Sequence, residues 1–352
     1  MNYSNTFWKV FENKILVDYE RAKKFVHDKE MPAPRFSNMY ITSSCNQNCQ
    51  YCEYSQENQR RIITPTERVI KSIEELRELG IRSIDFCGGG EPTLHPALDR
   101  LLHRCRALDI VVGLFTNLAV KNDKLLEAIV LCCSYVRISI DTYNNERYNL
   151  IRRPRALASN LSTVVRNIDK ILQYKHKYKA NIILGSKALI TKFNCNEIED
   201  FIKKSIDHGL DAVQFKKASL YDNLCVSQNE MVMIEKRMHE LKQKYLKHID
   251  ILFNVEKLTL HGQCFMHINH IFIDAFGDVY LCCYYLRRKA EHKIGNIYKN
   301  TIRDIWYGKR HWEVARSTRI KECNQMDCRW IKYNNMMRPL VYEDKLRQLD
   351  FA

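Results

Sequence analysis

The chain has 352 residues, of which 45% are hydrophobic, with only 11 glycines and 7 prolines. This composition excludes collagen-like and low-complexity proteins and is sufficient for one to three folded domains. The longest obvious apolar run spans about six residues, far short of the roughly 20 that cross a membrane. The formal net charge of +15 is spread along the chain. It therefore fits a solvated basic surface or a site for a small anion about as well as nucleic-acid binding.

The first 20 residues mix charges into their apolar positions and do not resemble a secretory signal, so we expect a cytoplasmic protein. In that reducing compartment, clustered cysteines point to metal or cluster ligands and scattered ones to small buried side chains. The spacing of the 14 cysteines therefore decides their meaning.

Short β-rich segments alternate with amphipathic helices over most of the chain. After a first predicted strand, Thr64 is expected to cap a helix that has Pro65 at its first position and Glu67 in a capping box. Gly80 is expected to end this helix. The remaining alternation predicts strands over 36–42, 81–86, 109–115, 135–140, 181–190 and 212–215, and helices over 96–107, 122–131, 156–178, 196–208 and 230–247.

Six βα units in succession predict an α/β fold with a parallel sheet and helices packed outside it. The economical architecture is a partial (β/α)6 TIM-like barrel, with its functional face at the C-terminal ends of the strands. From about His261 the pattern changes to cysteines, aromatics and a hairpin at Gly277, which predicts a smaller C-terminal α+β domain. The expected division is an N-terminal helical extension (1–34), the barrel (35–255), the smaller domain (256–340) and a tail (341–352).

Three cysteines follow the first strand as C-x3-C-x2-C: Cys45, Cys49 and Cys52. Three thiolates on one short loop can hold a [4Fe-4S] cluster and leave one iron open to an outside ligand. The alternative is three unrelated core cysteines, which the polar residues between them disfavour.

Two further strand ends carry candidate binding residues. Gly89 and Gly90 allow close approach of a ligand to the backbone, and Glu91 can accept a hydrogen bond from an ammonium group. After the fourth strand, Ser139 and Asp141 are expected to project to one side and bind ribose hydroxyls, while Arg152 or Arg153 meets a carboxylate. Taken singly, Ser139 and Asp141 fit helix capping equally well.

The cysteine triad with an aromatic before its last member, followed by the glycine-rich stretch, resembles the radical S-adenosylmethionine (SAM) superfamily over roughly 35–215. The resemblance implies that Cys45, Cys49 and Cys52 hold a [4Fe-4S] cluster whose open iron takes the amino and carboxylate groups of SAM. It also implies that Gly89, Gly90 and Glu91 receive the methionine ammonium. It further implies that the adenine of SAM contacts the Tyr51 backbone and that the nucleoside contacts Ser139 and Asp141. The carboxylate of SAM would pair with Arg152, or with Arg153 in its place.

A second cysteine set lies in the predicted smaller domain: Cys264, Cys282, Cys323 and Cys328. With residues 295–306 between its halves, this set resembles the SPASM or twitch domain that follows some radical SAM barrels. Four thiolates imply one auxiliary [4Fe-4S] cluster with no open iron. A structural zinc site also takes four thiolates and is the alternative.

The resemblance implies hydrogen abstraction from a substrate carbon by a 5′-deoxyadenosyl radical. Oxidation or epimerisation then follows, and Cys225 is the candidate hydrogen donor for epimerisation. We expect a small carbohydrate-like or natural-product substrate, a peptide substrate as the alternative, and flavodoxin or ferredoxin as the reductant. No membrane partner is expected. The alternative hypothesis, from another functional class, is a non-catalytic nucleic-acid-binding protein whose fold is stabilised by bound metal.

Overall fold

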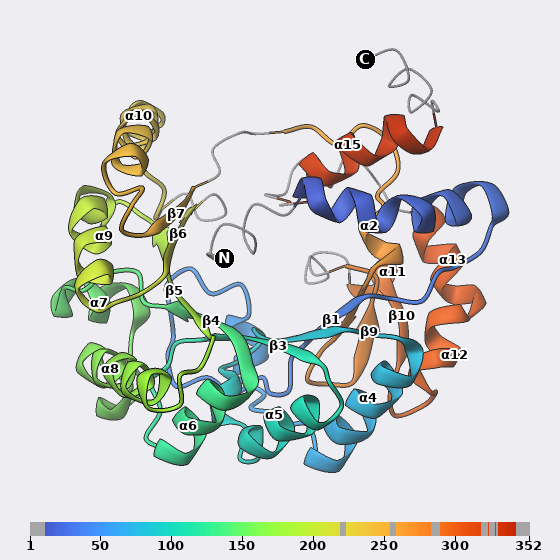
Figure 1. Cartoon of the computed structure of the whole chain (residues 1–352), viewed down its shortest axis with the longest axis horizontal. Coiled ribbons are helices and arrows are strands. Elements are labelled where there is room, and N and C mark those ends of the chain that lie inside the picture. Colours follow the sequence, from blue (N-terminus) through green and yellow to red (C-terminus); the bar gives the residue numbers. More distant parts are fainter. Residues whose placement is uncertain are drawn as a thin grey trace.

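The computed structural model describes residues 11–218, 223–253, 258–282, 289–317, 323, 328 and 330–342. Its described strands form one sheet in the order β10-β9-β8-β1-β2-β3-β4-β5-β6-β7. Neighbouring strands from β8 through β1 to β7 pair in parallel, and β9 and β10 are antiparallel. Figure 1 shows this sheet curving into an open arc with α4, α5, α6, α8 and α9 outside it. The α/β class and the partial-barrel architecture predicted from the sequence are confirmed.

The elements have these bounds. The strands are β1 Phe36–Met39, β2 Ser83–Phe86, β3 Val111–Thr116, β4 Cys133–Ser139, β5 Ile183–Ile190, β6 Ala212–Lys217, β7 Asp250–Phe253, β8 His270–Ile273, β9 Asp278–Tyr280 and β10 Lys293–Asn296. The α-helices are α2 Phe11–Lys23, α3 Ser55–Asn58, α4 Thr66–Leu79, α5 Leu98–Ala107, α6 Asp123–Cys132, α7 Asn145–Arg152, α8 Leu161–Lys177, α9 Ile198–Asp207, α10 Gln228–Lys244, α11 Lys289–His292, α12 Ile302–Tyr307, α13 Lys309–Arg316 and α15 Ile331–Tyr342. Short 3-10 helices span Pro92–Leu94, Leu157–Ser159, Cys195–Glu197 and Met266–Ile268, and a π-helix spans Lys24–Asp28.

The capping residues predicted from the sequence mark helix ends correctly only where their hydrogen-bond partners lie nearby in the chain. Gly80 ends α4 in the left-handed conformation, with φ of 104°, as predicted. The predicted cap at Thr64 is wrong, because its hydroxyl donates to the Ala275 carbonyl at 3.1 Å and Pro65 occupies the cap position. The long helix predicted from residue 156 begins at Leu161, where Asn160 accepts a hydrogen bond from the Thr163 backbone. A distant acceptor for Thr64 and a better cap at Asn160 explain these two differences.

The two faces of the sheet differ in chemistry. Most side chains that point outward from β3, β4 and β5 are apolar and pack under the helices, as Leu114, Val136 and Leu184 do with no exposed surface. The alternate positions face the concave side of the arc and include polar residues. Because parallel strands alternate their side chains with a period of two, the concave face is the one available for a ligand.

The C-terminal part of the chain extends the same sheet. β8 pairs with β1 in register Phe36 with His270, and the β8–β9 hairpin turns at Gly277, which has a φ of 79°. In Figure 1, α15 lies beside α2 at the opposite end of the arc from α10. The expected domain boundary at residue 256 falls in a segment outside the described residues, as does most of the expected tail over 341–352. No helix within the described ranges is long and apolar enough to cross a bilayer.

Candidate active site

The cysteine loop after β1 is fixed by polar side chains that reach distant elements. Asn46 donates to the Ala119 carbonyl at 2.8 Å and also accepts from the Asn117 amide at 2.7 Å. Gln47 is buried and donates to the Tyr148 hydroxyl at 2.6 Å. The polar residues between the cysteines therefore anchor the loop to the ends of neighbouring strands and to α7.

The thiols of Cys45, Cys49 and Cys52 lie close together on this loop. All three are half-buried free cysteines, and each lies within electrostatic reach of at least one other thiol of the triad. Burial, followed by the nearby Glu91 carboxylate, raises the pKa of Cys45 to about 12. Burial raises the pKa of Cys49 to about 11, which the Arg152 charge partly offsets. Thiols held so strongly protonated lose their protons when iron binds them.

The donor set of this loop fits an iron–sulfur cluster. Among the described residues, no three His, Cys, Asp or Glu side chains converge on a single metal ion. The thiolates of a four-iron cluster bind separate irons and need not converge in that way. Three thiols near one another on a loop held by long-range hydrogen bonds suit such a cluster.

The glycine-rich loop after β2 packs directly against the cysteine loop. The Glu91 backbone donates to the Ser44 carbonyl at 2.7 Å, and a Cβ on Gly90 would stand 2.1 Å from that same oxygen. At Gly89, which has a φ of 85°, a Cβ would stand 2.7 Å from the Tyr40 ring. The glycines therefore allow two backbone segments to touch, and this contact was not anticipated from the sequence.

Both carboxylate oxygens of Glu91 accept hydrogen bonds from neighbouring residues of the protein. Its Oε1 accepts from the Thr93 backbone at 3.1 Å, the Thr93 hydroxyl at 2.8 Å and the Thr116 hydroxyl at 2.5 Å. Its Oε2 accepts from the Asn117 backbone at 2.6 Å. Burial raises the pKa of this carboxyl above its usual range. Glu91 thus ties the ends of β2 and β3 together beside Cys45, and its contact with a methionine ammonium stays a prediction.

Asp141 and Arg152 form a buried ion pair below the cysteine loop. Arg152 Nη1 lies 3.0 Å from Asp141 Oδ2, and both side chains are about 5% exposed or less. Arg152 also donates to Gln47 Oε1 at 3.0 Å and to the Tyr51 hydroxyl, which itself donates to Asp141. Asp141 accepts from the Leu189 backbone at 2.7 Å as well. This network holds the cysteine loop against β4 and β5.

The projection of Ser139 and Asp141 to one side stays a prediction. β4 ends at Ser139, and Asp141 has a left-handed φ of 66°. Ser139 remains on the concave face beside Lys187 in the register of β4 and β5. Arg153 is exposed and ends α7 in the left-handed conformation. The ligand contacts expected for Ser139, Asp141 and Arg152 stay predictions.

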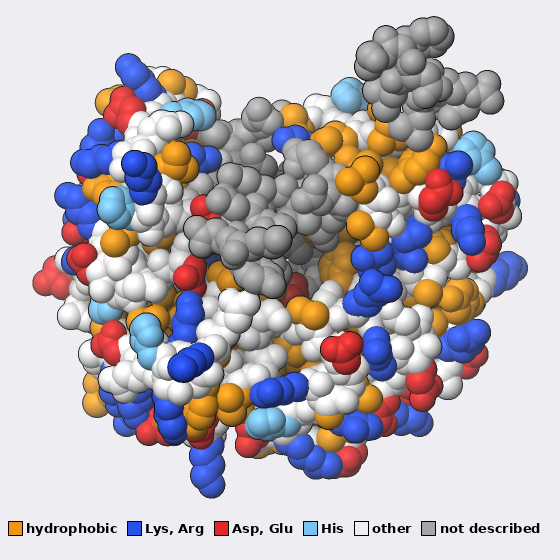
Figure 2. Space-filling view, in the orientation of Figure 1, with side chains coloured by type: hydrophobic (Ala, Val, Ile, Leu, Met, Phe, Trp, Pro, Cys, Tyr) orange, Lys and Arg blue, Asp and Glu red, His pale blue; other side chains and the backbone are white. Residues whose placement is uncertain are grey.

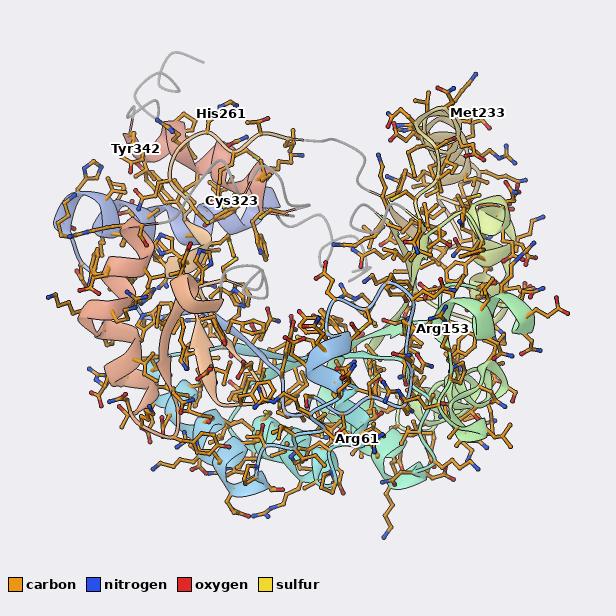
Figure 3. The ribbon with its side chains drawn as sticks, turned by 180° about the vertical axis from the view of Figure 1, so that it is seen from behind. Arg61, Arg153, Met233, His261, Cys323 and Tyr342 are labelled. Atoms are coloured by element: carbon orange, nitrogen blue, oxygen red, sulfur yellow. The ribbon has the colours of Figure 1, made fainter. Side chains whose placement is uncertain are left out.

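All four cysteines of the second set lie within the described residues, and each is half-buried. Cys264 lies within electrostatic reach of Cys323, and the Asn334 amide donates to its sulfur at 3.6 Å. Burial raises the pKa of Cys264 to about 11. Figure 3 shows the labelled Cys323 on the arm that carries His261 and Tyr342, away from Arg153.

Cys225 follows β6, where its thiol donates to the Ala218 carbonyl. Among the residues that the structure describes, no contact distinguishes it as a hydrogen donor. Cys87, which was not singled out among the scattered cysteines, packs with Tyr40, Phe272 and Tyr280 in a separate aromatic cluster that Phe115 also joins. This cluster forms an apolar wall on the concave face.

Comparison with known proteins agrees with this site. The model of the radical SAM superfamily matches residues 39–189, and that of the SPASM iron-sulfur cluster-binding domain matches residues 264–329. An uncharacterized protein of Methanocaldococcus jannaschii is 27% identical over 69% of this chain and 82% of its own length. An S-adenosylmethionine-dependent nucleotide dehydratase of Flammeovirga pacifica is 26% identical over 47% of this chain, and the match spans 57% of that protein.

A solved structure shares the fold. Streptococcus suis SuiB bound to S-adenosylmethionine superposes with a TM-score of 0.67 at 15% identity, covering 91% of this chain and 75% of SuiB. SuiB has also been solved bound to its precursor peptide SuiA. At this identity the likeness supports the fold alone.

Proposed function

Because this chain belongs to the radical SAM superfamily and carries a SPASM iron–sulfur cluster-binding domain, we propose that it abstracts a hydrogen atom from a carbon of a small substrate held on the concave face. Its cofactors are a [4Fe-4S] cluster, SAM and an auxiliary iron–sulfur cluster. The observation that carries the proposal is the cysteine loop, where three close thiols lie against the glycine-rich loop at the C-terminal edge of the sheet.

Cys45, Cys49 and Cys52 would hold the first cluster, with one iron left for SAM. When bound, this group supplies the electron that cleaves SAM to methionine and a 5′-deoxyadenosyl radical, which takes the hydrogen atom. Cys264, Cys282, Cys323 and Cys328 would hold the auxiliary cluster, for which we propose the [4Fe-4S] form over zinc.

The chain's own residues orient the loop and exclude water. The Asp141–Arg152 pair holds Gln47 and Tyr51, so the cysteine loop cannot shift without breaking a buried network. The aromatic cluster around Tyr40 and Phe272 gives the concave face a dry wall, which protects a carbon radical from side reactions.

The product depends on what quenches the substrate radical. An auxiliary cluster held by the second cysteine set would accept the second electron while the substrate radical loses a proton, which gives oxidation. A thiol such as that of Cys225 would instead return a hydrogen atom, which gives epimerisation and leaves a thiyl radical that takes an electron from the reductant and a proton from solvent. Both outcomes fit a small carbohydrate-like or natural-product substrate. Peptide modification is the second candidate; SuiB, which shares the fold, has been solved with a precursor peptide.

Nucleic-acid binding is the less favoured alternative. Figure 2 shows Lys and Arg side chains mixed with Asp and Glu over the visible face instead of gathered in one stripe. A binding protein would also have no use for the thiol triad and the adjacent glycine-rich loop.

The test is reductive cleavage of SAM by anaerobically reconstituted protein. The reductant that we propose is flavodoxin or ferredoxin, and the location that we propose is the cytoplasm. We expect release of 5′-deoxyadenosine even without substrate. Deuterium transfer into 5′-deoxyadenosine from candidate compounds then identifies the substrate. Salt-sensitive nucleic-acid binding with no SAM cleavage would contradict the proposal.

A further inference from the structure

Three basic side chains line the concave face on consecutive strands. Arg137 on β4, Lys187 on β5 and Lys216 on β6 alternate with neighbours that face the helices. On β5, Ser186 points outward and bonds to Ser205 of α9 at 3.0 Å. On β6, the Phe215 ring packs on Phe201 of α9. The three cations therefore point to the opposite side, into the arc.

The strand register places these cations together. Lys187 pairs with Ser139 on one side and Gln214 on the other, and Lys216 pairs with Leu189, two residues after Lys187. Arg137 Nη1 donates to Gln214 Oε1 at 3.1 Å across β5, where Gly185 presents no side chain between them. The Arg137 guanidinium also lies 3.5 Å from the centre of the Phe115 ring, which orients it.

Lys187 is the unusual member. Its side chain is half-buried, and its ammonium has no hydrogen bond or ion pair to any residue that the structure describes. Burial lowers the pKa of Lys187 well below its usual range, and the charges of Arg137, Lys216 and Arg152 lower it further. The Asp141 carboxylate opposes this effect, but it is already paired with Arg152. Charged side chains are seldom buried without a partner, so this arrangement favours a ligand that brings negative charge.

We propose that Arg137, Lys187 and Lys216 form an oxyanion site that binds the phosphoryl group of a small phosphorylated substrate. This inference rests on the proposed function, since it places the substrate on the concave face. A phosphate monoester carries between one and two negative charges at neutral pH and three acceptor oxygens, which suits three cations better than a single carboxylate does. The planar fork of Arg137 and the point charge of Lys187 are both established ways to hold phosphate.

The experiment is calorimetric titration of inorganic phosphate into reconstituted protein with SAM present, comparing the wild type with Lys187→Met. Removal of one charged hydrogen-bond donor predicts about 10- to 100-fold weaker binding. Lys217→Met is the matched control, because Lys217 is the next residue after Lys216, faces outward and pairs with Glu235 at 2.5 Å. It removes the same charge and is expected to leave phosphate binding unchanged. Lys216→Met serves as the second variant if Lys187→Met fails to incorporate iron.

Three results would overturn the inference: no saturable phosphate binding by the wild type, equal losses in Lys187→Met and Lys217→Met, or tighter binding of malonate than of phosphate at the same site. The last would assign the site to carboxylates. Release of 5′-deoxyadenosine by the wild type without substrate, measured on the same preparation, tests the proposed function separately, since it does not require phosphate binding.

Discussion

Substitution of Arg152 by methionine tests the network under the cysteine loop. The change keeps the length of the side chain but removes its bonds to Asp141, Gln47 and Tyr51. Asp141 then remains as a buried carboxylate that, among the described residues, keeps its bonds from Tyr51 and the Leu189 backbone. Breaking a buried pair in this way costs about 3–5 kcal/mol of unfolding free energy. For a chain of 352 residues, a loss of that size lowers the midpoint of thermal unfolding by roughly 4–7 °C.

Urea unfolding of the cluster-free protein measures this loss, and iron content after reconstitution reports on the loop. The matched control is Lys170→Met, which breaks an exposed pair with Asp123 of 2.7 Å. That pair should contribute below about 1 kcal/mol. The double variant Asp141→Asn with Arg152→Met should lose less than the sum of the single variants by at least about 1 kcal/mol, because neither charge is left alone. An Arg152→Met protein as stable as Lys170→Met, or strict additivity, would refute the reasoning.

Three further predictions concern the core, the pH response and the second cysteine set. Gly113→Ala should lose about 1–3 kcal/mol in urea unfolding, because its Cβ would lie 2.3 Å from Asp85 Oδ1; unchanged stability would contradict this. Burial lowers the pKa of His311 to about 4, so as the pH falls the unfolded chain binds a proton at this histidine before the folded chain does. The contribution of the neutral His311 to the free energy of unfolding is therefore complete above about pH 6.5 and is lost as the pH falls towards 4. His311→Asn should flatten the fall in stability across this window, and an unchanged slope would exclude His311 as its cause. Substituting the four cysteines of the second set by alanine should reduce the iron content from about eight to about four per chain; one zinc and four irons in the wild type would contradict the auxiliary cluster.

The features that the sequence predicted are those whose signals are local. The spacing of Cys45, Cys49 and Cys52 puts three thiols on one loop whatever the rest of the chain does, and the hairpin at Gly277 follows from its own residues. The alternation of strands and helices also gave most of the parallel sheet. β7, which spans Asp250–Phe253, was not predicted.

The features that the sequence did not predict depend on distant partners. Glu91 accepts hydrogen bonds from Thr116 and Asn117, which belong to the next strand end, so its structural role could not be read locally. Pairing of β8 with β1 joins residues more than 230 positions apart in the chain. Lys187 did carry a usable signal, since a lysine inside the apolar run of β5 breaks the pattern of a strand buried on both faces.

The most direct test of the central claim is whether SAM binds an iron that no residue of this chain occupies. Electron–nuclear double resonance on the reduced protein, with SAM labelled with nitrogen-15 at its amino group, measures that contact. The account predicts coupling of the label to the cluster in the wild type, and its loss when Cys45, Cys49 and Cys52 are all replaced by alanine. A wild-type cluster with full iron content but no coupling to the label would contradict it.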